Sequence, residues 1–236
     1  MRMKPVLIVE NDELLAGAGW LARVLDRRGL PYRLVDATAA GLDGIRADDL
    51  AGMIMLGGRA HAWQEDEAPF LRDERLLTEQ CVARDVPILG CCLGGQVLAR
   101  ALGGTVRAAA AGEYGWLDVV PTGEGSRDPL FRLAATADEV YLWHDDEFTV
   151  PAGAVHLATS AATPVQAFRF GRAWGLQFHP ECDLGLYDSW HGNFPDACAQ
   201  VGLDPQAMRR TAERRERQDD LFAVRLIDAF ASVVLA

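Results

Sequence analysis

The sequence predicts an α/β fold of three layers, in which an open, mostly parallel but mixed sheet carries helices on both faces. Three observations support this prediction. Short apolar runs alternate with segments of helical periodicity over residues 5–104, as in folds with a parallel sheet. Extended runs joined by turn residues follow from residue 105, and the segment 182–236 is again helical. No linker interrupts this pattern, so we expect a single domain spanning residues 1–236.

The first half of the chain alternates strands and helices. Residues 5–10, PVLIVE, form a nearly continuous apolar run, which is typical of a strand buried on both faces. Residues 16–30 place apolar side chains at helical spacing, and Gly29 ends this predicted helix. The same patterns predict further strands at 32–37, 51–58 and 87–91. They predict further helices at 70–84 and 93–102.

The second half is expected to extend the sheet and then cover it. Extended runs occur at 105–110, 116–121, 139–144, 165–170 and 173–180. The turn residues of RFGRA, 169–173, predict a hairpin between the last two runs. In the helical extension 182–236, an apolar stripe should dock on the body of the protein. The stripe consists of Ala223, Leu226, Ile227, Phe230 and Val234.

Composition and charge exclude several classes of function. The chain has 236 residues, of which 50% are hydrophobic and 24% charged, and its formal net charge is −11. An acidic surface repels nucleic acid and anionic lipid, so we expect neither as a partner. The N-terminal apolar run is too short for a signal peptide, and no apolar segment approaches the roughly 20 residues of a membrane span. We therefore expect a cytoplasmic protein.

The five cysteines suggest neither a disulfide framework nor a metal site. They follow no C-x-x-C pattern and no regular spacing. Cys182, His191 and Cys198 match no standard metal-site spacing, and we expect no bound metal. In a reducing compartment most of these cysteines should be small buried side chains.

The segment PILGCCLGGQ, 87–96, places two adjacent cysteines between a predicted strand and a predicted helix. Gly90 and Gly94 flank Cys92 two residues away on either side, as in the sharp strand-to-helix turn of a nucleophile elbow. Cys92 would then project at the carboxyl end of the sheet, while Cys91 points into the core. Unpaired N–H groups at the helix start favour a thiolate and can stabilise an oxyanion. The alternative is a buried cysteine in a tight, glycine-rich turn.

A thiolate that attacks an acyl group needs a base and a group that orients the base. In GLQFHPE, 175–181, His179 follows an apolar strand and Glu181 lies two residues further on. The period of two puts both side chains on one face, and Pro180 favours extended backbone at His179. The acid follows the histidine, whereas in α/β-hydrolases it precedes the histidine, which argues against that class. The alternative is a structural histidine beside a surface glutamate.

Together, PILGCCLGGQVLARALGG (87–104), EYGW (113–116) and GLQFHPE resemble the class I, triad-type glutamine amidotransferases. The resemblance covers about residues 50–181 and is strongest to stand-alone members similar to the glutaminase domain of GMP synthase. It implies the flavodoxin-like architecture of this family.

The same resemblance implies the roles of three residues. Cys92 would be the nucleophile that attacks a γ-glutamyl amide, His179 the general base and then acid, and Glu181 the group that orients His179. No metal or organic cofactor is implied.

The resemblance also implies a substrate site around this triad. Gly58 and Leu93 would supply oxyanion-hole N–H groups. The substrate would contact Gly57, Gln96 and a loop, WHDDEF (143–148), that includes Trp143, His144 and Asp145.

Two residues depart from the family pattern. Gly95 stands where the family often has histidine, and Asp145 stands where the stand-alone branch tends to have glycine. The run Asp145–Glu147 could recognise a substrate ammonium or reject an acidic competitor, but a solvated acidic loop is favoured, and His144 is favoured as a structural residue.

Three functions stay open at this point. The chain could be an amidotransferase subunit that passes ammonia to a separate synthetase subunit. It could be a free-standing γ-glutamyl peptidase or hydrolase that acts on a γ-glutamyl conjugate. Both would use the same triad and a small-molecule γ-glutamyl substrate. The third is a non-catalytic binding or regulatory relative. The arginine-rich segment 209–218 is expected to be a solvated helix face, favoured over a docking patch for an acidic partner.

Overall fold

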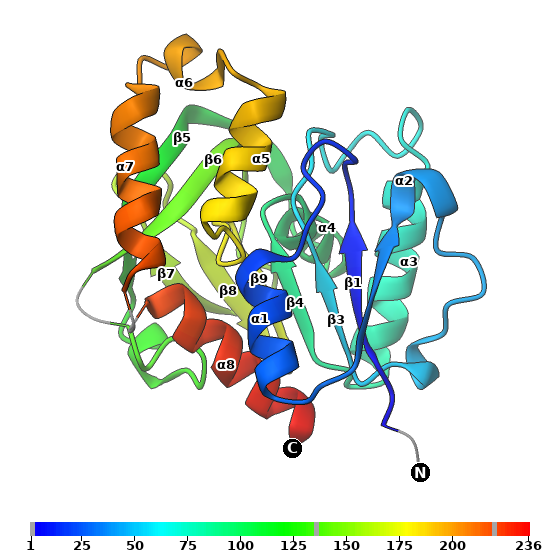
Figure 1. The fold of residues 1–236 in the computed structure, drawn as a ribbon. Helices are drawn as coiled ribbons and strands as arrows, with labels where there is room; N and C mark the ends of the chain where they lie inside the picture. Colours follow the sequence, from blue (N-terminus) through cyan, green and yellow to red (C-terminus); the bar gives the residue numbers. More distant parts are fainter. Residues whose placement is uncertain (1–2, 135–136, 219–220) are drawn as a thin grey trace.

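A nine-stranded mixed sheet forms the centre of the molecule in a computed structural model, which describes residues 3–134, 137–218 and 221–236. The strand order is β2-β1-β3-β4-β9-β8-β7-β5-β6. In Figure 1, α1 and α8 lie in front of this sheet and α3 and α4 lie behind it. Each face has its own apolar core, one containing Leu21, Leu226 and Phe230 and the other Leu71 and Val97. The predicted three-layer α/β fold is confirmed.

The first half follows the predicted alternation of strands and helices. Its elements are β1 (Val6–Glu10), α1 (Gly19–Arg27), β2 (Tyr32–Asp36), α2 (Ala37–Ala40), β3 (Gly52–Met55), α3 (Phe70–Ala83), β4 (Ile88–Cys91) and α4 (Leu93–Ala101), with a 3-10 turn at Ala47–Asp49. Strands β2, β1, β3, β4 and β9 pair in parallel in that order. Along β1, Val6 and Ile8 face one core while Leu7 and Val9 face the other, which explains why the run is apolar throughout.

The second half differs from the prediction in three places. Its elements are β5 (Val106–Pro121), a 3-10 turn at Gly125–Arg127, β6 (Asp138–Phe148), β7 (Val155–Thr159), β8 (Ala167–Phe170) and β9 (Ala173–Leu176). The runs predicted at 105–110 and 116–121 belong to one strand, β5, which is interrupted by a bulge. Strand β7 was not predicted. The segment 143–148, predicted as a loop, is the end of β6.

The end of β6 escaped prediction because three consecutive acidic residues disfavour a strand. In the structure β6 is an edge strand, and the three acids pair with Tyr114 and Arg107 on β5 and with His61 in the loop after β3. The predicted hairpin between β8 and β9 is confirmed, with Gly171 in the left-handed region at φ 58°.

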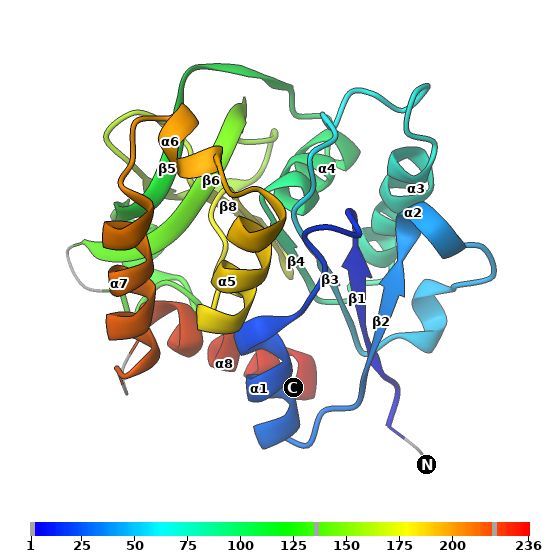
Figure 2. The ribbon, with the colours of Figure 1, turned by 45° about the horizontal axis from the view of Figure 1, so that its top comes forward.

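The C-terminal part is helical, as predicted, with α5 (Leu184–Asn193), α6 (Ala197–Gln200), α7 (Pro205–Glu216) and α8 (Phe222–Leu235). The predicted stripe on α8 docks as expected: four of its residues are buried and Val234 packs against the same core. Figure 2 brings the upper edge of the sheet toward the viewer, where α5 and α6 lie beside it. Among the residues described, no helix is long and apolar enough to cross a membrane.

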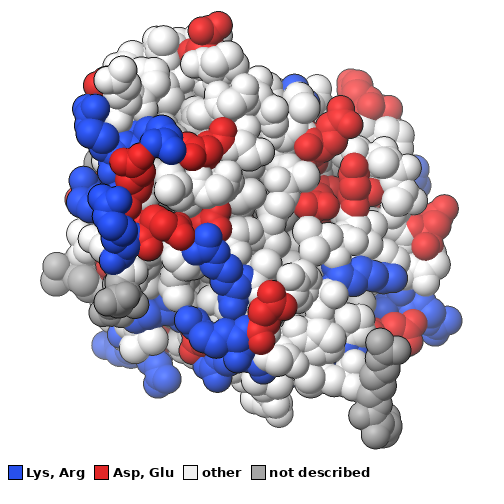
Figure 3. All heavy atoms as spheres, in the orientation of Figure 1, with Lys and Arg blue, Asp and Glu red and all other residues white. Residues whose placement is uncertain are grey.

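The arginine-rich segment lies on α7, where cationic and acidic side chains alternate on the surface (Figure 3). Arg209, for example, pairs with Asp188 at 2.8 Å. One arginine departs from the predicted solvated face. Arg215 is buried, pairs with Glu139 at 2.9 Å and lies over the ring of Trp116.

Candidate active site

The turn between β4 and α4 places Cys92 at an apex where the backbone is constrained. Cys92 has φ 50°, and Asp85 is the only other non-glycine residue with positive φ in the described chain. A Cβ on Gly90 would lie 2.5 Å from the carbonyl oxygen of Gly94, and one on Gly94 would lie 2.3 Å from that of Met55. Only glycine fits on either side of the apex. Cys92 therefore borders a cavity, whereas Cys91 is fully buried in the core.

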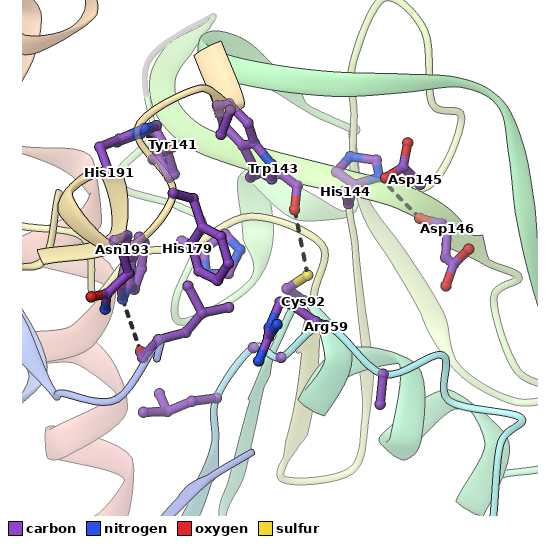
Figure 4. A pocket seen from close by; sticks show the side chains of 18 of the residues that line it. Arg59, Cys92, Tyr141, Trp143, His144, Asp145, Asp146, His179, His191 and Asn193 are labelled. Carbon is purple, nitrogen blue, oxygen red and sulfur yellow. Dashed lines mark hydrogen bonds between the residues drawn. The ribbon is translucent and has the colours of Figure 1, made fainter. Parts of the chain in front are cut away.

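His179 and Glu181 reach the same cavity from the segment after β9. His179 Nδ1 lies 2.7 Å from Glu181 Oε1, and both side chains are buried. The main-chain N–H of His179 donates to the carbonyl of Tyr141 at 2.8 Å, and the Trp190 ring packs edge-on against the imidazole. These contacts fix the ring, and its other side faces Cys92 (Figure 4).

The electrostatics of His179 depend on its two neighbours. Burial acts to lower its pKa, but the nearby carboxylate of Glu181 and sulfur of Cys92 raise that pKa to about 10. The imidazole therefore carries a proton at neutral pH, between a carboxylate and a sulfur. Gln177, which sequence reasoning did not single out, donates from Nε2 to Cys92 Sγ at 3.8 Å.

The glycine segment after β3 lies against these groups. A Cβ on Gly57 would lie 2.6 Å from His179 Cε1 and 3.6 Å from Cys92 Cβ. A Cβ on Gly58 would lie 2.9 Å from Leu93 Cδ2. Leu93 is the first residue of α4, where main-chain N–H groups have no partner within the helix. Gly58 thus packs against Leu93, the residue next to Cys92, and lines the same cavity as the sulfur.

The cavity has a volume of about 520 Å³ and includes all five residues predicted to contact the substrate, Gly57, Gln96, Trp143, His144 and Asp145. Three of them lie on strand β6 and not on a loop. The Cys92 thiol faces the main-chain oxygen of Trp143 at 3.9 Å. His144 is buried, donates from Nδ1 to the main-chain oxygen of Asp146 at 2.9 Å and lies 3.3 Å from Glu113, contacts that suit a structural residue.

The acidic residues of this segment do not form the solvated loop that was predicted. Asp146 is buried and its Oδ2 lies 2.6 Å from His61 Nδ1. Asp145 accepts a hydrogen bond from the Tyr114 hydroxyl, and Glu147 pairs with Arg107. Two of the three, Asp145 and Asp146, line the cavity.

Comparison with known proteins places the chain in a family. The family model described as glutamine amidotransferase class-I matches residues 17–192. The chain belongs to the class I glutamine amidotransferases. The predicted resemblance is therefore confirmed.

Two curated relatives carry related names. This amidotransferase is 31% identical over 181 residues to a glutamine-hydrolyzing GMP synthase of Corynebacterium glutamicum, a match that covers 75% of the chain and 32% of that relative. It is 33% identical over 143 residues to a relative from Methanosarcina mazei that is named as one subunit of glutamine-hydrolyzing GMP synthase. That second match covers 59% of the chain and 69% of the relative. The chain thus spans about a third of the first relative's length.

Solved structures of similar size share the whole fold. A glutamine amidotransferase from Thermotoga maritima superposes with a TM-score of 0.89 at 27% identity, covering 100% of this chain and 99% of that one. A glutamine amido transferase from Methylobacillus flagellatus gives 0.84 at 25% identity, covering 98% and 95%. Both similarities extend over the C-terminal helices that the family model does not match.

Five further residues of the amidotransferase cavity were not predicted. They are Arg59, which follows Gly58, and the wall formed by Trp190, His191, Asn193 and Phe194. Most of these residues lie on α5 or just after it, and the carboxylate of Asp183 caps that helix by accepting from the Leu186 N–H at 2.8 Å. In the sequence, Asp183 could have been recognised as a helix N-cap two residues after Glu181, which would have placed the start of α5 next to the triad.

Hydrogen bonds hold this wall in place. Trp190 Nε1 donates to the carbonyl of Leu15 at 2.8 Å, and Asn193 Nδ2 donates to that of Leu14 at 2.7 Å. Arg59 binds both carboxylate oxygens of Asp12 and lies over the ring of Phe194. His191 and Cys198 approach each other at 3.5 Å, but the described residues contain no group of three or more His, Cys, Asp or Glu that could hold a metal ion.

Proposed function

We propose that this amidotransferase hydrolyses a γ-glutamyl amide through a thioester on Cys92. The observation that carries the proposal is the buried group Glu181, His179 and Cys92, in which the imidazole pairs with the carboxylate and borders the same cavity as the sulfur at the end of the sheet. This arrangement supplies a nucleophile, a proton carrier and an orienting group in contact with one another.

The reaction would proceed in two steps. The Cys92 thiolate attacks the γ-carbonyl carbon, a C–S bond forms, and the carbonyl electron pair moves to oxygen. The N–H groups of Gly58 and Leu93 stabilise this oxyanion. When the tetrahedral species collapses, the C–N bond breaks and His179 protonates the departing ammonia or amine. Water, deprotonated by His179, then attacks the thioester, which releases glutamate and restores Cys92.

Gly57, Gln96, Trp143, His144 and Asp145 would form the substrate site. The amide of Gln96 and the main chain of β6 can pair with the polar groups of a γ-glutamyl substrate, and the Trp143 ring, which packs against His191, can border the part of the substrate that lies further from Cys92. Asp145 adds a carboxylate that suits a substrate ammonium. The proposed chemistry uses only side chains, main-chain N–H groups and water.

A thioester on the protein is the direct test of this proposal. The full chain is mixed with glutamine or with a panel of γ-glutamyl amides, quenched in acid and analysed by peptide mass spectrometry. We expect a γ-glutamyl adduct on Cys92 and none on Cys91. Failure of an electrophilic glutamine analogue to label Cys92, on a chain whose other thiols react when unfolded, would favour the non-catalytic relative.

Two physiological settings are compatible with this chemistry. The similarity to the Methanosarcina mazei relative, named as one subunit of GMP synthase, supports an amidotransferase subunit that passes ammonia to a separate synthetase subunit. The size of the cavity supports a free-standing hydrolase of γ-glutamyl conjugates, because 520 Å³ lies within the roughly 300–1,000 Å³ of sites for ligands larger than glutamine. Weak glutaminase activity that rises on addition of a co-purifying synthetase favours the first, and rapid turnover of conjugates by the chain alone favours the second.

We also propose that the protein works in the cytoplasm. All five cysteines are free thiols in the structure, and a nucleophilic thiol has to stay reduced. A periplasmic or secreted location of the native protein, shown by fractionation, would contradict this.

A further inference from the structure

The side chain of Asn11, the residue that follows β1, packs against the loop that follows β3. Asn11 is buried, and its Nδ2 donates to the main-chain oxygen of Leu56 at 3.0 Å. A Cβ on Gly58 would lie 3.0 Å from the Asn11 carbonyl oxygen and 3.1 Å from Asn11 Cβ. Asn11 therefore fixes one end of the segment 56–58 and packs directly against the other.

The Leu56 carbonyl also joins this segment to the elbow helix. It accepts a second hydrogen bond, from the N–H of Gly94 in the first turn of α4, at 3.1 Å. The two residues proposed to bind the oxyanion thus lie on either side of the hydrogen bond between Leu56 and Gly94. Gly58 comes two residues after Leu56, and Leu93 comes directly before Gly94. A shift of the Leu56 carbonyl would change the distance between their N–H groups.

Glu74 on α3 determines how the Asn11 amide is oriented. Its Oε1 accepts the other proton of Asn11 Nδ2 at 3.1 Å. The amide group has two donors on nitrogen and none on oxygen, so it satisfies the two acceptors Leu56 and Glu74 in one orientation only. A half-turn of the amide would place its oxygen against both acceptors. An apolar residue at position 74 would leave one N–H of Asn11 without this partner in the interior.

Glu74 is an unusual residue for its surroundings. It is fully buried on the face of α3 that carries Leu71, Leu77 and Thr78, and its Oε2 has no hydrogen-bond partner among the described residues. Burial raises the pKa of its carboxyl to about 8, and the hydrogen bond from Asn11 opposes this only in part. A buried acid of this kind lowers stability relative to a well-packed apolar side chain, so stability alone does not explain it.

We propose that Asn11 and Glu74 are positioning residues that hold the 56–58 segment against the start of α4, and so set the spacing of the oxyanion-binding N–H groups. The inference rests on the proposed function, because without a thioester there is no oxyanion to bind. It predicts an effect on kcat more than on KM, since oxyanion donors act mainly on the transition state.

The test compares steady-state turnover of a γ-glutamyl amide by four full-length variants. Glu74→Leu removes the acceptor and should lower kcat about tenfold with KM within about twofold of wild type. Glu74→Gln keeps an acceptor oxygen and should retain at least about a third of the wild-type kcat. Asn11→Ala should lower kcat at least as much as Glu74→Leu. Thr78→Val is the matched control: its buried hydroxyl, one helical turn from Glu74, bonds to the Glu74 main-chain oxygen and to Met55 Sδ but not to Asn11 or residues 56–58, and kcat should not change.

A double variant separates positioning from general damage. If Glu74 acts through Asn11, then Asn11→Ala combined with Glu74→Leu should be no slower than Asn11→Ala alone. Equal kcat for Glu74→Leu and Thr78→Val, a Glu74→Gln variant as slow as Glu74→Leu, or additive losses in the double variant would each overturn the inference. Circular dichroism checks folding, and if Glu74→Leu does not fold, an unchanged kcat in Asn11→Ala overturns it instead. If the wild-type chain forms no thioester, the proposed function itself is contradicted. If the wild-type chain is active and the variants have the same kcat as wild type, only the positioning role is contradicted.

Discussion

On the Cys92 side of the cavity the chain approaches itself so closely that a Cβ on Gly57, Gly90 or Gly94 would collide with neighbouring atoms. On the opposite side, β6, α5 and the residue after α5 present the large side chains Trp143, Trp190 and Phe194. The first wall is made of backbone, which presents N–H groups at fixed positions, and the second is made of side chains, which can vary without moving the backbone. This difference suggests that the first wall supports the reaction and the second selects the substrate.

Removing the sulfur from the backbone wall should have the largest effect on turnover. Cys92→Ala should lower kcat for γ-glutamyl hydrolysis by at least about 10³-fold, because the nucleophile is lost. Cys91→Ala is the matched control, since Cys91 points into the core and its loss should lower the free energy of unfolding by about 1 kcal/mol with turnover retained. An inactive Cys91→Ala beside an active Cys92→Ala would show that the assignment of the apex is wrong.

A methyl group added to the backbone wall should have the next largest effect. In Gly57→Ala the new Cβ meets His179 Cε1, so the ring has to move away from Cys92, and we expect kcat to fall about 10²-fold. Gly192→Ala on α5 is the control, because a Cβ there meets no atom within 4 Å. Similar kinetics for the two variants would contradict the idea that this wall has no room for side chains.

The buried carboxyl of Glu74, next to the backbone wall, should make the free energy of unfolding depend on pH. The pKa of Glu74 is raised from 4.5 in the unfolded chain to about 8 in the folded one. Its contribution to stability is therefore fully present below pH 4.5 and is lost as the pH rises through 8. Relative to Glu74→Gln, the wild-type free energy of unfolding in urea should fall by on the order of 4 kcal/mol between pH 4.5 and 9. A difference that does not change with pH would show that Glu74 ionises normally.

The side-chain wall should respond more weakly and with a different kinetic signature. Phe194→Ala should raise KM for a bulky γ-glutamyl conjugate several-fold, corresponding to about 1 kcal/mol of lost contact, with kcat unchanged. KM for glutamine itself should change less, because we expect a smaller substrate bound at Cys92 to make less contact with Phe194. Equal changes for both substrates would argue against a role of this wall in selecting the substrate.

The parallel half of the fold and the triad could be predicted because local chemistry specifies them. Continuous apolar strands, glycines at two positions around Cys92 and the alternation of His179 and Glu181 are visible in short segments. The end of β6 and the α5 wall depend on contacts between distant segments. The acids of β6 have partners such as His61 and Tyr114, and α5 reaches the cavity through hydrogen bonds to the carbonyls of Leu14 and Leu15. No periodicity in the sequence indicates such pairings.

Strands β4 and β9 are neighbours, and the N–H of Cys92 bonds to the carbonyl of Leu176 at 2.9 Å. Cys92 directly follows β4 and His179 lies three residues beyond the end of β9, so neighbouring strands hold the thiol and the imidazole, although most of the second half of the fold lies between them along the chain. Their spacing is independent of the length of that intervening chain. We therefore expect the thiol and the imidazole to keep their relative positions if residues are inserted, or the chain is cut, at the exposed turn around Gly123.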